Sequence, residues 1–301
     1  MSVQFTILGS GSGGNCAFLE TSEVRLLIDA GFSGRQIRQK LAAISRAPEG
    51  LSGILITHEH SDHISGLVGL AARLNLPIFC NRQTREAIEA QLQIKINCQL
   101  FDTGNSFEIG DVRIDTFSVP HDAIDPVGFL LQTPGGKIGF LTDLGHCTKL
   151  ILQRLRHSNV LVLETNHDVQ MLQDDPRRPW SLKQRIMSRH GHLSNEAAAD
   201  VAEQMACSEL RQIYLGHLSR DCNTPKLADE AVSGRLRKIG AQHVAVQVTS
   251  QEAACPTFTL QNFPSASPVP SALQETFSQT ISAIRAETIP APAFVGQQLL
   301  F

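Results

Sequence analysis

The stretch THEHSDH at positions 57–63 constrains the fold more than any other part of this chain. It follows the apolar run 54–56, which is typical of a short buried strand. Three imidazoles and a carboxylate are therefore crowded at the end of a strand, where burial is costly unless something neutralises their charge. A divalent metal ion is the usual neutralising partner, but a single ion rarely needs all four groups.

The spacing of these four groups predicts two metal pockets. His58 and His60 are two positions apart in extended chain, so both can point to one side. Asp62 and His63 come where the next helix begins, so they face a second position about 3.5–4 Å away, as two-metal hydrolases require. The further ligands expected at the ends of other strands are His121, Asp143 and His217. Taken singly, each of these three has the alternative interpretation of an ordinary polar residue.

The order of segments predicts the fold class. Strands are expected at 3–8, 16–20, 24–30, 53–57, 112–119, 128–133, 137–142, 159–164 and 211–216. Helices are expected at 33–44, where Ser33 is the cap, and at 62–74, 194–206 and 224–240. Strand-rich and then strand–helix order in each half predicts an α/β (α+β) fold, with two packed sheets and helices on both outer faces.

Composition indicates a soluble globular enzyme, with 42% hydrophobic and 18% charged residues. We see neither a secretory signal nor an apolar run long enough to span a membrane. Seven cysteines without a CxxC pair favour reduced thiols, so we expect a cytoplasmic protein. The pattern predicts one catalytic domain over 1–262, followed by a largely disordered tail at 263–301 that is rich in Pro, Ser and Ala.

The charge distribution leaves two interpretations open. A net charge of −3 argues against a broadly basic nucleic-acid-binding surface. Between 176 and 240, however, eleven Lys or Arg residues stand against seven Asp or Glu. This stretch is either a solvated helical surface or a rim that faces phosphate groups.

The motif THEHSDH, with a later His, a strand-end Asp and a final His, resembles the metallo-β-lactamase superfamily. The resemblance implies a four-layer αββα sandwich and two Zn or Mn ions. It assigns His58, His60 and His121 to one ion, and Asp62, His63 and His217 to the other, with Asp143 bridging and Asp62 also taking part in catalysis. Asp143 and His217 are 74 positions apart, too close to contain the inserted domain of the β-CASP nucleases.

Other segments point to phosphodiester chemistry. LETNHD and GHLSNEAAAD resemble the Glu and His segments of RNase Z, which implies that Glu164 orients His192 as a general acid. A helix cap at Ser194 or Asn195 is the plain alternative for the second segment. The Gly-rich turn LGSGSGGNC and the loop GHLSRDCNTP offer donors to phosphate oxygens; the expected substrate-binding residues are Ser10, Ser12, Asn15, Ser219 and Asn223.

The long run 164–195, with HDAIDPVGF and HLSRDCNTP, resembles the YycJ/WalJ-type metallohydrolases over about residues 3–250. This resemblance implies a phosphodiesterase that degrades DNA from the 5′ end, in repair or replication. The alternatives are a phosphodiesterase acting on RNA or a small molecule, and a non-catalytic interaction protein with a structural metal site. The remaining histidines are expected to be ordinary: His146, His157, His167, His190 and His243.

The chain ends in QQLLF, which resembles the peptide by which bacterial replication and repair proteins bind the DNA polymerase sliding clamp. Gln297 would seat at the rim of the clamp pocket, and Leu300 and Phe301 would fill it. The alternatives are a chance match or a tail that docks on its own domain. DNA and the sliding clamp are thus the expected partners.

Overall fold

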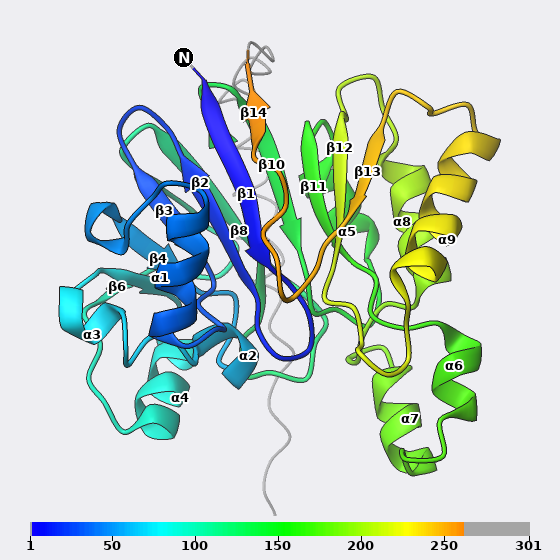
Figure 1. Ribbon diagram of the computed structural model, residues 1–301, viewed down its shortest axis with the longest axis horizontal. Coiled ribbons are helices and arrows are strands. Elements are labelled where there is room, and N and C mark those ends of the chain that lie inside the picture. The colour runs from blue at the N-terminus through cyan, green and yellow to red at the C-terminus, as the bar shows by residue number, and fades with distance from the viewer. Residues whose placement is uncertain (1, 262–301) are drawn as a thin grey trace, which may run out of the picture. The chain divides into compact units, whose positions relative to one another are not determined.

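The protein is described from a computed structural model that covers residues 2–261; the predicted tail at 263–301, with its QQLLF ending, lies outside the described residues. The described residues form two seven-stranded sheets (Figure 1). Sheet A has, in spatial order, β14 (Phe258–Leu260), β1 (Val3–Gly9), β2 (Cys16–Glu20), β3 (Arg25–Ile28), β4 (Gly53–Leu55), β5 (Ile78–Cys80) and β6 (Cys98–Leu100). Sheet B has β13 (Ala245–Val248), β12 (Gln212–Gly216), β11 (Val160–Glu164), β10 (Gly136–Leu141), β9 (Val127–Thr133), β8 (Val112–Ser118) and β7 (Ser106–Ile109).

Helices cover the outer face of each sheet. On the side of sheet A lie α1 (Gly34–Ala43), the short 3-10 turn Pro48–Gly50, α2 (Ser61–Ile64), α3 (Ala71–Leu74) and α4 (Arg82–Leu92). The later helices, which accompany sheet B, are α5 (Lys149–Leu155), α6 (Val169–Asp174), α7 (Trp180–Ile186), α8 (Asn195–Met205) and α9 (Pro225–Lys238). None of the helices in residues 2–261 is long and apolar enough to cross a membrane.

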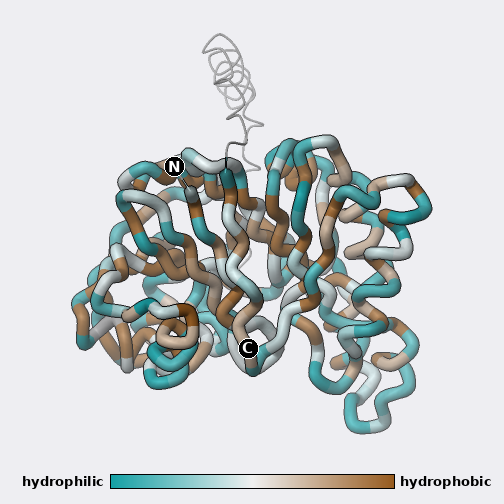
Figure 2. Tube along the Cα trace, turned by 45° about the horizontal axis from the view of Figure 1, so that its top comes forward, coloured by the Kyte–Doolittle hydropathy of each residue, from teal (hydrophilic) through white to brown (hydrophobic). Residues whose placement is uncertain are grey.

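Alternating side chains divide the core into layers. Along β1, Phe5 belongs to the core between the sheets, where its ring lies 6.0 Å from that of Tyr214 in sheet B. Leu8, from the same strand, points the other way into the core shared with Ile37 of α1. A third core joins the outer face of sheet B to α8 and α9. Figure 2 shows the hydrophobic stretches running along the strands. The predicted αββα sandwich is therefore confirmed.

The local predictions were right for α1 and wrong for the segment 62–74. Ser33 caps α1, and its side chain accepts from the N–H of Gln36 as expected. The segment 62–74 is two short helices, α2 and α3, instead of one. Gly66 explains the difference, because its N–H donates to Ala30 O at 2.7 Å and a Cβ there would come within 2.5 Å of a backbone oxygen. Tertiary packing thus fixes the chain at Gly66 against the loop that follows β3.

The strand directions bring distant loops to one edge. Strands β10, β11 and β12 are parallel, and β8 runs the same way because β9 pairs antiparallel with both β8 and β10. The segments that follow these four strands therefore emerge at the same edge of sheet B. Between β10 and β12 the described chain contains only α5 to α8 and β11, without an inserted domain.

Candidate metal centre

The loop after β4 presents the first ligand candidates as the spacing predicts. His58 lies in the extended segment after the strand, and His60 is the N-cap residue of α2. Asp62 and His63 fall in the first turn of α2, so they turn toward a different side. His58, His60 and His121 offer donor atoms that all lie within 4.8 Å of one another. A second such group combines Asp62, His63 and His217.

Asp143 lies between the two groups. Its Oδ2 is 3.3 Å from His63 Nε2, and its Oδ1 is 3.2 Å from His217 Nδ1 and 3.8 Å from His121 Nε2. Asp143 and His217 both have positive φ, at 56°, which is uncommon for residues other than glycine. Both residues directly follow strand segments at the shared sheet edge, and the unusual backbone turns them at that point.

The hydrogen bonds of the imidazoles leave lone pairs facing one another. His63 Nδ1 lies 2.8 Å from Asp29 Oδ2, so the neutral ring donates there and its Nε2 carries a lone pair. That lone pair faces carboxylate oxygens of Asp62 at 3.4 Å and Asp143 at 3.3 Å. Three acceptors that converge in this way repel unless a proton or a metal cation lies among them. Burial opposes protonation of His63, yet Asp62 and Asp143 outweigh it and raise the pKa of that imidazole, so this point attracts positive charge.

Two buried polar atoms support the same conclusion. His58 Nε2 and Asp143 Oδ2 have no hydrogen-bond partner, although such an atom costs about 1–3 kcal/mol when left unsatisfied. Burial and neighbouring imidazoles hold the pKa of His58 well below its usual value, so the ring is a neutral ligand. Burial would raise the pKa of Asp143, but His217 and His63 outweigh it and keep the carboxyl well below its usual range. These clusters of nitrogen and oxygen donors fit divalent metal ions.

A second layer of residues positions the ligands. Asp29 is fully buried, and its Oδ1 accepts from the N–H of Thr57 at 2.9 Å while its Oδ2 bonds His63. Thr57 Oγ1 also lies 3.0 Å from His58 Nδ1. Sequence reasoning missed both Asp29 and Thr57. The available signal was a carboxylate directly after an apolar strand, the same pattern that indicated Asp143.

Glu164 connects the predicted acid to the metal ligands. Its Oε1 lies 2.7 Å from His192 Nδ1 and 2.8 Å from His217 Nδ1, and its Oε2 accepts from the N–H groups of Leu144 and Leu193. Burial would raise the pKa of Glu164, but His192 and His217 lower it to about 2. Burial opposes protonation of His192, yet Glu164 outweighs it and raises the pKa of that imidazole. The predicted Glu164–His192 contact is therefore present; the contact with His217 was not expected.

A cavity of about 210 Å³ opens beside these groups. His192, Ser12 and Ser219 line it, together with Arg178, which was not among the predicted site residues. His167, which was expected to be one of the ordinary histidines, also lines the cavity and is buried. Burial lowers the pKa of His167 to about 4, so the ring is neutral. The signal that could have found it is its position three residues after Glu164.

The other three residues predicted to bind substrate do not line this cavity. Ser10 Oγ donates to Asn15 Oδ1 at 2.8 Å and accepts from the N–H of His217 at 2.8 Å. Asn15 Nδ2 in turn donates to Asp62 Oδ2 at 3.2 Å. The Gly-rich turn therefore braces ligand candidates of the second group. Asn223 exchanges amide hydrogen bonds with Asn195 at 2.8 and 2.9 Å. Ser10 and Asn223 reach instead a neighbouring cavity of about 200 Å³, which shares Ser219 with the first.

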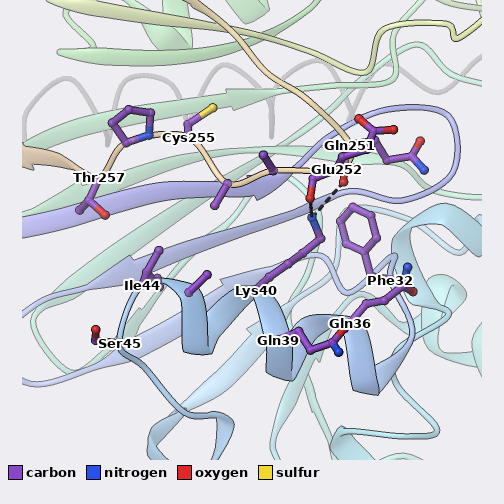
Figure 3. A pocket seen from close by; sticks show the side chains of 14 residues that line it. Phe32, Gln36, Gln39, Lys40, Ile44, Ser45, Gln251, Glu252, Cys255 and Thr257 are labelled. Atoms are coloured by element: carbon purple, nitrogen blue, oxygen red, sulfur yellow. Dashed lines mark hydrogen bonds between the residues drawn. The ribbon is translucent and has the colours of Figure 1, made fainter.

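Two further features lie apart from this chemistry. A larger groove of about 960 Å³ runs between α1 and the segment 251–257, where Lys40 donates to the carbonyls of Gln251 and Glu252 (Figure 3). No metal-ligand group found within residues 2–261 includes a residue of this groove. His157, Cys207 and Glu209 form another donor trio. The side chains of His157 and Glu209 are about half exposed, and His157 Nδ1 lies 3.4 Å from Glu209 Oε1, an ordinary surface contact that accounts for their proximity.

Comparisons with known proteins agree with the fold. Residues 24–218 match the model of the beta-lactamase superfamily domain. The chain is 38% identical over 242 residues to Exodeoxyribonuclease YycJ of Bacillus anthracis, covering 80% of this chain and 91% of that one. It is 38% identical over 237 residues to Exodeoxyribonuclease WalJ of Streptococcus pneumoniae, covering 77% and 88%. The metallo-beta-lactamase fold protein YhfI from Bacillus subtilis shares the fold, with a TM-score of 0.65, 15% identity and coverage of 86% and 100%.

Proposed function

This chain belongs to the metallo-β-lactamase superfamily, in the group of the YycJ and WalJ exodeoxyribonucleases, and we propose that this metal-dependent hydrolase degrades DNA from the 5′ end. The single observation that carries the proposal is the position of His192. It lines the same cavity as His60, Asp62 and His217, which come from both donor groups, and Glu164 fixes its ring. A proton donor held beside a two-metal site is what a phosphodiester with a poor leaving group requires.

The proposed ligand sets follow the two donor groups. His58, His60 and His121 would hold one ion. Asp62, His63 and His217 would hold the other, with Asp143 shared. Zn and Mn both suit nitrogen and oxygen donors of this kind. When bound, such ions supply charge stabilisation to the phosphate oxygens and a water of lowered pKa, a role in which Asp62 takes part as a ligand.

The residues of the chain supply orientation and a proton. Glu164 accepts from His192 Nδ1 and favours the protonated ring, in which Nε2 carries the second proton, the one to be transferred. As the bond from phosphorus to the 3′ oxygen breaks and a water oxygen forms the new bond, that proton passes to the leaving oxygen. Ser12 and Ser219 line the cavity and offer hydroxyl donors to the non-bridging oxygens. Ser10 and Asn223 line the neighbouring cavity. Ser10 Oγ donates to Asn15, and Asn223 Nδ2 donates to Thr165 and Asn195, so these residues would shape the place of an adjacent phosphate instead of donating to it.

The first experiment uses duplex DNA labelled at either the 5′ or the 3′ end and protein reloaded with Mn or Zn. Early release of a labelled mononucleotide from the 5′ end alone is the expected result. Release from the 3′ end, or cleavage at internal positions, would overturn the proposed polarity. Intact DNA together with hydrolysis of RNA or of bis-p-nitrophenyl phosphate would move the assignment to another phosphodiester. If the protein cleaves none of the three substrates (DNA, RNA and bis-p-nitrophenyl phosphate), only a non-catalytic role remains.

We also propose a DNA repair or replication role in which the tail binds the sliding clamp. This part of the proposal rests on the sequence Gln297-Gln-Leu-Leu300-Phe301 alone, which lies outside the described residues. Tethering would raise the local concentration of the enzyme on DNA. Removal of residues 297–301 is expected to abolish clamp binding in a pull-down and to leave hydrolysis of naked DNA unchanged. Undiminished clamp binding by the shortened chain would contradict the assignment.

A further inference from the structure

Trp180 is the only tryptophan of the chain, and 58% of it is exposed. It begins α7, on which Leu182 is also 36% exposed, and Val169 of the neighbouring α6 is 38% exposed. Large aromatic side chains are usually buried, because each removes a large apolar area from water. An exposed tryptophan therefore marks a contact surface for a partner.

The same segment forms part of the wall of the metal cavity. Arg178, two residues before Trp180, lines the cavity, and so does Ile186 at the end of α7. Figure 1 shows α6 and α7 extending beyond the strand ends on the side of sheet B. A ligand that enters the cavity therefore has the α6–α7 pair beside it. Trp180 itself is not among the cavity residues, so its ring is available to a part of the ligand that stays outside.

The α6–α7 pair is held firmly, and most of its cations are used for this purpose. Lys183 Nζ donates to Gln173 O at 2.6 Å and ties α7 to α6. Arg185 pairs at 2.5 Å with Asp122, next to the ligand candidate His121. Arg177 and Arg178 pair with Asp175 and Asp221. A rigid platform loses little conformational entropy when a partner binds to its exposed ring.

The chemistry of the segment favours a nucleic-acid strand. Between 176 and 195 the sequence has five Lys or Arg residues and no Asp or Glu. Arg189, near the end of this segment, pairs with His146 Nε2 at 2.9 Å instead of with a carboxylate. The surface thus combines an exposed aromatic face with a segment that carries no carboxylate of its own, so a phosphate backbone can lie beside it while a base stacks on the ring.

Stacking on Trp180 requires that this strand is unpaired, because inside a duplex both faces of a base are covered by the neighbouring base pairs. The nucleotide next to the one in the cavity can therefore offer its face to the tryptophan only where the strand has separated from its complement. We propose that Trp180 stacks on an unpaired base of this strand, next to the nucleotide in the cavity. The inference rests on the proposed function and adds the contact that holds the separated strand.

The fluorescence of the native protein tests the contact, because every tryptophan photon comes from position 180. The full chain is titrated with a single-stranded DNA oligonucleotide whose phosphorothioate linkages resist hydrolysis. We expect saturable quenching. Stacking contributes about 1–3 kcal/mol per base, so Trp180→Ala is expected to lower the affinity about 5- to 150-fold in the anisotropy of a dye-labelled oligonucleotide. Most arginines of this segment are already paired with carboxylates, so stacking contributes more to the contact than charge does. The loss of affinity in Trp180→Ala should therefore persist at raised salt.

Two control variants separate stacking from general damage. Trp180→Phe keeps an aromatic face and is expected to retain most of the affinity. Leu150→Ala removes another exposed apolar side chain, 61% exposed on α5, and should change nothing. All three variants should hydrolyse bis-p-nitrophenyl phosphate as the wild type does, because Trp180 does not line the cavity. Equal affinity of Trp180→Ala and wild type, or binding without quenching, would overturn the inference.

The outcomes also separate this inference from the proposed function. Quenching by the oligonucleotide without any cleavage of ordinary DNA would support stacking and overturn the exonuclease assignment. Cleavage from the 5′ end with unaltered tryptophan fluorescence and normal activity of Trp180→Ala would support the exonuclease and overturn stacking. Absence of oligonucleotide binding would overturn the stacking contact, whatever the enzyme cleaves.

Discussion

Replacement of Asp29 by asparagine tests how the chain fixes its ligands. Asp29 Oδ2 accepts from His63 Nδ1 at 2.8 Å and leaves His63 Nε2 with the lone pair that faces Asp62 and Asp143. Asparagine fits the same space and tolerates the positive φ of 59° at this position. Its NH₂ group, however, must face either His63 Nδ1 or the N–H of Thr57. If the NH₂ group faces His63, the proton of the ring moves from Nδ1 to Nε2. If it faces Thr57, the NH₂ group and the N–H of Thr57 are two donors that oppose each other.

The expected loss follows from this choice. Disruption of a carboxylate that orients a metal-binding histidine typically costs 10- to 100-fold in metal affinity, or about 1.4–2.8 kcal/mol. We therefore expect Asp29→Asn to bind metal at His63 about 10- to 100-fold more weakly. The assay is competition with a chromophoric chelator, with metal content measured after dialysis. Both ions should be weakened to some degree, because Thr57 also contacts His58, but the ion at His63 should be lost first.

Asp115→Asn is the matched control. Asp115 on β8 also pairs with a cation, Arg113 at 3.1 Å, and accepts from Gln132, but it contacts none of the ligand candidates. This variant should bind both ions as the wild type does. Wild-type affinity for both ions in Asp29→Asn would refute the reasoning, since the hydrogen bond would then have no part in fixing the imidazole.

Two further variants test other parts of the site. His192→Ala is expected to lower turnover about 10²- to 10⁴-fold with unchanged metal content, because the variant lacks the proton donor but none of the assigned ligands; loss of metal would instead identify His192 as a ligand. Gly31→Ala is expected to lower the free energy of unfolding by about 1–3 kcal/mol in urea, because a Cβ there would overlap the carbonyl of Asp62. The neighbouring Gly69→Ala, whose Cβ would meet atoms only at 3.5 Å, is the control, and equal stability of the two variants would contradict this packing.

The sequence by itself determined the layers and the candidate metal ligands. Alternating apolar residues in strands and the spacing of THEHSDH are local properties, and polar residues at strand ends gather wherever strands run in parallel. His121, Asp143 and His217 could therefore be named before any contact was known. Ser33 was equally predictable, because a helix cap depends on the residues within one turn.

Tertiary structure alone decided which neighbours these residues have. Glu164 and His217 are 53 positions apart, yet they share a hydrogen bond of 2.8 Å, nearly as short as the 2.7 Å between Glu164 and His192. Asn15 reaches Asp62 across 47 positions, and Gly66 interrupts an apparently continuous helix because Ala30 accepts its N–H. No local pattern encodes such contacts, since each depends on how two remote segments pack. The sequence therefore supplied the donors, and packing determined which lone pairs face one another and leave room for a cation.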